Sequence, residues 1–166
     1  MLRRAREFGP VALIPAAWGF VAATHAGVVA ESTLLIAHVV MTTLLVVFAV
    51  TGRADMREGT LRVWWLVITA GIPVTAAGLA GLHFGVALLQ GVALFGWMLL
   101  PVAGFLDTGR RATQRPWVYY GAAGGCVAGA VVAAVGLFTA SVPVTAGLVL
   151  VGAGQTAAIA DAAFGY

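Results

Sequence analysis

The chain alternates long apolar stretches with short charged segments. Four stretches contain no Asp, Glu, Lys or Arg, and they cover residues 8–30, 32–52, 63–106 and 116–160. A helix needs about 20 apolar residues to cross a bilayer. The first two stretches therefore fit one crossing each, and the last two fit two crossings each. The pattern predicts an all-α, polytopic membrane protein with six transmembrane helices.

The two longest stretches have to be divided, because a single helix of that length would overshoot any bilayer. The tripeptide His83, Phe84, Gly85 can form a tight reversal, since glycine tolerates turn conformations. The segment TASVP at 139–143 can turn in the same way, with Pro143 suited to the first turn of a helix. The predicted helices, in one transmembrane domain over 1–166, cover about 10–30, 33–52, 62–82, 86–106, 117–138 and 142–162.

The positive charges predict the topology. All nine cations are arginines in three clusters, at 3–6, 53–62 and 110–115. With six crossings all three clusters fall on one side of the membrane, and the other side has no arginine. The positive-inside rule then predicts an up-down bundle in the cell membrane with both termini in the cytoplasm. The pI of about 9.8 reflects this topology and an attraction to anionic lipid, without nucleic acid as a partner.

Histidines supply the candidate chemistry. His25 and His38 are predicted at similar depths on neighbouring antiparallel helices, and His83 ends the third helix on the same side. Glu31 and Gln90 add polar groups near that side. Ionisable groups within a membrane normally face protein or a cavity. The three histidines are therefore candidate cofactor ligands, with haem as the cofactor considered; interhelical hydrogen bonding and a proton relay are the alternatives.

Two fragments carry a family resemblance. AHVVM at 37–41 and LFGWMLLP at 94–101 resemble segments of the main subunit of haem-copper oxidases, in which a helix histidine binds haem. The fragments cover about a tenth of the chain. The resemblance implies a haem-ligand role for His38. The chain has Gln90 where a further ligand histidine would be wanted.

Small and polar residues predict how the helices pack. Glycines recur at a spacing of four and seven in the fifth helix, at Gly121, Gly125, Gly129 and Gly136, and such a stripe lets another helix approach within the protein or across a dimer. In the fourth helix Pro101 leaves the Trp97 carbonyl without its helical donor.

Three residues of the later helices have simpler expected roles. Gln155, near mid-depth in the sixth helix, is expected to form a hydrogen bond between helices. Asp107 and Asp161 lie at helix ends and are expected to pair with arginines.

Three hypotheses for function stay open. The chain contains no Walker loop, HExxH, CxxC or GxSxG motif, so the leading hypothesis is an accessory, structural or binding protein and not an enzyme. It would associate with lipid and with itself or a larger membrane complex. The second is a haem-binding or electron-transfer protein using two of the three histidines. The third is a solute or proton transporter with a site near Pro73, Gln90 and Gln155; a polar cavity at mid-membrane would favour it, whereas a close-packed bundle would favour the first.

Overall fold

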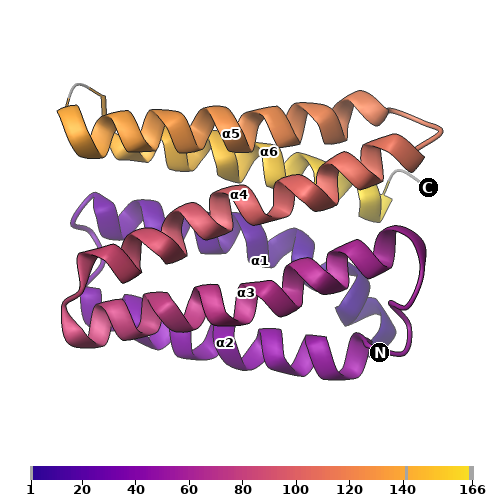
Figure 1. The fold of residues 1–166 in the computed structure, drawn as a ribbon, viewed down its shortest axis with the longest axis horizontal. Coiled ribbons are helices and arrows are strands. Elements are labelled where there is room, and N and C mark those ends of the chain that lie inside the picture. Colours follow the sequence, from indigo (N-terminus) through magenta and orange to yellow (C-terminus); the bar gives the residue numbers. More distant parts are fainter. Residues whose placement is uncertain (1, 141, 165–166) are drawn as a thin grey trace.

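The protein is a bundle of six long helices (Figure 1). The computed structural model describes residues 2–140 and 142–164, with side chains from residue 11 onward, and it has no strand in these ranges. The helices are α1 (Leu2–His25), α2 (Glu31–Gly52), α3 (Gly59–Phe84), α4 (Ala87–Arg111), α5 (Pro116–Thr139) and α6 (Val144–Phe164).

The helices run alternately up and down the bundle (Figure 1). The start of α1 and the end of α6 lie at the same end as the connections 53–58 and 112–115, and this end is called the arginine end. The opposite end, called the histidine end, holds the connections 26–30 and 85–86. The side chains of Arg3, Arg4 and Arg6 lie outside the described part of the chain, but the helix that carries them begins at the arginine end.

The apolar character of the helices suits a membrane. Helices α2 to α6 are each long and apolar enough to cross a bilayer, and the described apolar part of α1, Val11–His25, is shorter. Large apolar side chains are exposed along the helices, with Val131 of α5 57% and Val149 of α6 63% exposed. Soluble proteins rarely expose so much contiguous apolar surface. The bundle is therefore compatible with an integral membrane protein.

The first helix differs from its predicted bounds. It begins at Leu2 and not near Pro10, and it ends at His25 and not at Ala30. Gly27 causes the early end, because its φ of 74° lies in the left-handed region and its N–H donates to the Thr24 carbonyl at 3.0 Å. The apolar residues that follow belong to the connection, although hydropathy assigns them to the helix.

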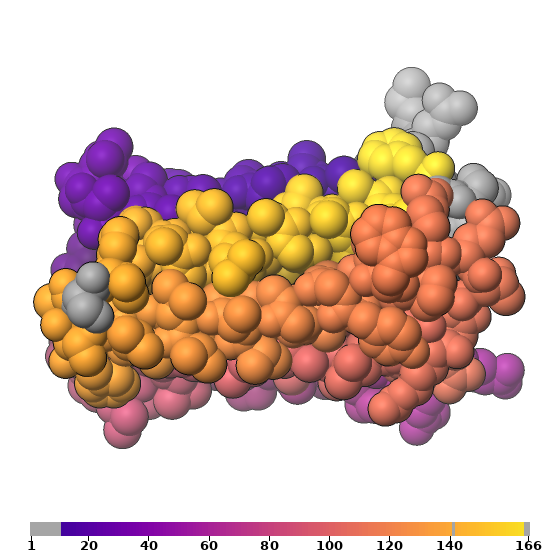
Figure 2. Space-filling model, turned by 90° about the horizontal axis from the view of Figure 1, so that it is seen from above, coloured from indigo at the N-terminus to yellow at the C-terminus, as the bar shows by residue number. Residues whose placement is uncertain are grey.

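The bundle is an incomplete ring. Each of the pairs α5–α6, α3–α4 and α4–α5 packs along much of its length, while α1 packs on α6 and α2 packs on α3. Helices α1 and α2 have little contact with each other, although they are consecutive in the chain. Figure 2 shows the face on which α5 and α6 lie side by side. Helix α2 is thus joined to the bundle mainly along one face.

The closest packing joins α5 to α6. A Cβ added at Gly129 would lie 2.7 Å from the Gly147 carbonyl oxygen, and one added at Gly136 would lie 2.7 Å from the Val142 carbonyl oxygen. Gly121 has no such neighbour within 4 Å, and Gly125 has only one, at 3.8 Å. Within the protein the predicted stripe therefore packs closely through Gly129 and Gly136, and close approach at Gly121 and Gly125 stays a prediction for a contact with a second chain.

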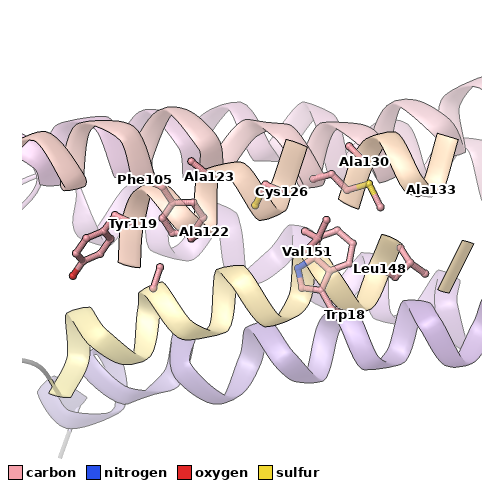
Figure 3. Close-up of a cluster of buried hydrophobic side chains, with 12 residues drawn as sticks. Trp18, Phe105, Tyr119, Ala122, Ala123, Cys126, Ala130, Ala133, Leu148 and Val151 are labelled. Atoms are coloured by element: carbon pink, nitrogen blue, oxygen red, sulfur yellow. The ribbon is translucent and has the colours of Figure 1, made fainter. Parts of the chain in front are cut away.

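The helix period explains which residues of α5 face α6. Steps of four residues drift by about 40° each around an α-helix, whereas alternating steps of four and three stay on one face. The buried face follows the second pattern, through Ala122, Cys126, Gly129, Ala133 and Gly136. Figure 3 shows the small side chains of this face opposite Leu148 and Val151 of α6.

Candidate functional site

The predicted histidine cluster is not assembled. His25 is the last residue of α1 and is exposed, whereas His38 lies seven residues after the start of α2 at Glu31. The predicted match in depth is therefore wrong, because the turn at Gly27 moves His25 to the end of the bundle. His83 lies in the last turn of α3 and is exposed. Among the described side chains no three His, Cys, Asp or Glu residues come close enough to hold a metal ion.

His38 is the histidine inside the bundle. Its Nδ1–H donates to the Leu34 carbonyl at 2.9 Å, which leaves Nε2 as the acceptor nitrogen of the neutral ring. The ring lies against the α3 backbone, since a Cβ added at Gly78 would be 2.8 Å from Nε2. Thr42, one turn further along α2, donates to the His38 carbonyl at 2.7 Å. The contact between Nε2 and α3 leaves no space for a haem on that side of the ring.

The remaining polar residues at the histidine end support local structure. The Gln90 side-chain amide donates to the Gly81 carbonyl at 3.2 Å, and the backbone N–H groups of Gly85 and Val86 donate to the same oxygen. Gln90 thus fixes the reversal between α3 and α4. Glu31 is exposed in the first turn of α2, where the helix dipole favours a carboxylate. Ser32 is not the N-cap as its type suggests: Ala30 has that position, with no side-chain cap.

The strongest polar constellation is a buried hydrogen-bond network around Gln155, halfway along α6. Pro101 has no N–H to give to the Trp97 carbonyl, and the Gln155 amide donates to that oxygen from α6 at 3.1 Å. The Gln155 side chain on α6 thereby supplies the hydrogen bond that the Trp97 carbonyl on α4 lacks because of Pro101. Gln155 is 5% exposed, so both groups would be costly to leave unpaired.

Gln155 also connects α1 and α5 to the network. The Trp18 indole N–H donates to the Gln155 side-chain oxygen at 2.9 Å, and the Gln155 amide lies 3.6 Å from the Cys126 sulfur. The Trp18 side chain lies against Gly152, where an added Cβ would be 3.0 Å from the Trp18 Cβ. Figure 3 shows Trp18 extending from α1 into the buried cluster near Val151.

A second branch extends the network to α3. The Trp97 indole N–H donates to the Thr75 hydroxyl at 2.9 Å, and that hydroxyl donates to the Gly71 carbonyl at 2.9 Å. The Trp97 ring lies on the α3 backbone, because a Cβ added at Gly71 would be 2.5 Å from the ring. Thr75 is 2% exposed. Five helices, α1, α3, α4, α5 and α6, are thus joined through hydrogen-bonded side chains near mid-bundle.

The arrangement separates the residues of the predicted transport site. Gln90 lies at the α3–α4 reversal, Gln155 at mid-bundle, and Pro73 is exposed on the outside of α3. Two shallow apolar grooves lie on the exterior, one between α2 and α3 and one between α5 and α6. Neither groove includes Gln90 or Gln155 in its lining.

Ion pairs stabilise the arginine end. Arg111 pairs with Asp107 at 2.9 Å, one turn apart on α4, and Arg115 pairs with Asp161 of α6 at 3.1 Å. Both pairings were expected from the sequence and are confirmed. The two arginine side chains are 57% and 50% exposed, and surface pairs of this kind contribute at most about 1 kcal/mol. The Arg115 pair ties the α4–α5 connection to the end of α6.

No protein-family model, curated protein or solved structure matches the chain. Its candidate role therefore rests on its own residues.

Proposed function

We propose that the chain is a six-crossing integral membrane protein with an accessory or structural role, held by its apolar surface to other membrane helices. This proposal rests on one observation, namely that the polar groups at mid-bundle form hydrogen bonds within the protein. The side chains of Trp18, Thr75, Trp97 and Gln155 all form hydrogen bonds inside the protein. A site for solute or substrate would need some of these groups to face a cavity instead.

The proposed topology places the arginine end in the cytoplasm. The start of α1, the end of α6 and the connections that carry Arg53, Arg57 and Arg115 all lie at that end (Figure 1). Interfacial aromatic residues support the same placement, because Trp117 is 69% exposed beside Arg115 and Trp64 and Trp65 lie in the second turn of α3. Helix α1 has 24 residues in all, enough for a sixth crossing when its first turns lie at the interface.

The outer face of α2 is the proposed contact surface, here called the α2 stripe. Its exposed residues recur at steps of four and three and are all branched at Cβ: Ile36, Val40, Thr43, Val47 and Val50. This spacing keeps them on one face, as in helices that pack side by side. Branched side chains also lose little rotamer freedom on packing. Because α2 packs mainly on α3, this face is left open.

Site-specific photocrosslinking in native membranes tests the proposal. A photoreactive amino acid at Val47 in the α2 stripe is expected to give a discrete protein adduct, because a partner helix would cover this position. The matched control is the same amino acid at Val131, which is exposed on α5, where only lipid is expected. Equal absence of protein adducts at both positions would contradict an accessory role through α2.

A further inference from the structure

A groove at the histidine end combines an apolar floor with one polar group at its rim. It lies between α2 and α3, has a volume of about 360 Å³, and is lined by Leu35, Ala76, Leu79, Ala80, His83 and Phe84. The small side chains of Ala76 and Ala80 create the depression along α3. From Ala76 to His83 the groove follows about 10 Å of the helix axis, taking 1.5 Å per residue. His83 is its one polar side chain.

His83 is available to a ligand. It is exposed, and no hydrogen bond to its ring nitrogens occurs within the described part of the chain. A neutral imidazole offers one N–H donor and one acceptor nitrogen. Phe84 packs against the His83 ring at a centroid distance of 4.7 Å in an edge-to-face arrangement. Because Phe84 is 72% exposed, it presents an aromatic surface beside the donor.

The charges around the groove restrict its occupant. All nine arginines lie toward the other end of the bundle, and the nearest charged residue of α2 is Glu31. An anionic head group would therefore find no cation at this end and would be repelled by the Glu31 carboxylate. An uncharged head group with oxygen acceptors suits the His83 N–H and avoids this repulsion.

We propose that this groove binds a membrane-soluble quinone. Its apolar tail would lie on Ala76 and Ala80, its flat head would pack beside Phe84, and a carbonyl oxygen would accept a hydrogen bond from His83. The groove opens toward the surroundings of the bundle, so such a ligand would enter from the bilayer. This inference concerns the groove between α2 and α3 and does not depend on the accessory role of the α2 stripe.

Photolabelling with a decyl-tailed azidoquinone tests the proposal on the full chain in neutral phospholipid nanodiscs. Label is expected in the peptides that contain residues 35 and 76–84, and unmodified decylbenzoquinone is expected to displace it. Ala76 is an exposed residue of the groove, and Ala76→Leu places a larger side chain there. This substitution should lower the labelling about tenfold, because it excludes the quinone sterically. Ala128→Leu makes the same change on the exposed face of α5 and should leave it unchanged.

The role of His83 is tested separately from the shape of the groove. His83→Phe keeps an aromatic ring and removes the N–H, so labelling should fall about fivefold, as expected for one lost hydrogen bond. His83→Gln keeps a donor and should retain most of it. Label spread evenly over the exterior, or displaced by phosphatidylglycerol and not by decylbenzoquinone, would overturn the proposal, as would equal labelling of Ala76→Leu and Ala128→Leu.

Discussion

Replacing Gly147 with alanine is expected to lower the free energy of unfolding by about 2 kcal/mol, a typical cost of inserting a methyl group into a packed interface. The added Cβ would lie 2.5 Å from the Gly129 carbonyl oxygen and 2.7 Å from the Ala133 backbone nitrogen. Both are backbone atoms of α5, so no side-chain rotation relieves the contact. The two helices would have to separate along the tightest part of the bundle. Reversible unfolding in sodium dodecyl sulfate, followed by circular dichroism, measures the loss.

Gly121→Ala is the matched control for this substitution. Gly121 has no atom within 4 Å of an added Cβ, and it lies on α5, the helix that Gly147 contacts. The alanine variant is expected to be as stable as the original protein or more stable by up to about 1 kcal/mol, because alanine favours a helix over glycine. Comparable destabilisation by both changes would show that the four-residue glycine stripe, and not the observed face, packs on α6.

Gln155→Leu is expected to cost about 2–3 kcal/mol, because a buried group that loses its partner costs about 1–3 kcal/mol and this change affects two of them. Leucine has a similar size, so the packing of α6 is largely kept. The Trp18 indole N–H would lose its acceptor, and the Trp97 carbonyl would lose the donor that replaces the missing Pro101 N–H. The same unfolding assay measures the effect.

A double-mutant cycle with Trp18→Phe separates the hydrogen bond from the loss of packing. Removing the indole N–H and its acceptor together should cost less than the sum of the two single changes, by about 1 kcal/mol, since hydrogen bonds inside membrane proteins contribute about 0.6–1.7 kcal/mol. Strict additivity, or a Gln155→Leu protein as stable as the original, would mean that Gln155 does not hold α1 to the bundle.

The sequence predicted the number and order of the helices because charged residues lie at or beside three of the five connections and turn-forming residues mark the other two. It failed at the end of α1, where Val28 and Val29 are apolar but follow the turn at Gly27. Hydropathy reports whether a side chain is apolar, whereas the end of a helix depends on backbone conformation. The depth assigned to His25 was wrong for this reason.

The network at Gln155 could be predicted only in part. Pro101 identifies the Trp97 carbonyl as a group that needs a donor, and the position of Gln155 identifies it as a buried amide that needs partners. Their pairing depends on the rotation of α4 and α6 about their axes, which the single sequence does not specify. Which glycines of α5 pack on α6 depends on helix rotation in the same way, because several faces of that helix carry small residues.

Cys126 provides the most direct test of a closed bundle, because this native cysteine already lies inside the hydrogen-bond network around Gln155. It is fully buried on α5 and contacts the Gln155 amide. A water-soluble maleimide applied to either side of native membranes should leave Cys126 unmodified, and it should react after denaturation in sodium dodecyl sulfate. A Ser32→Cys variant, exposed at the histidine end, confirms that the reagent is active. Modification of Cys126 in the native membrane would reveal a water path to mid-bundle and would contradict a closed accessory bundle in favour of a transporter.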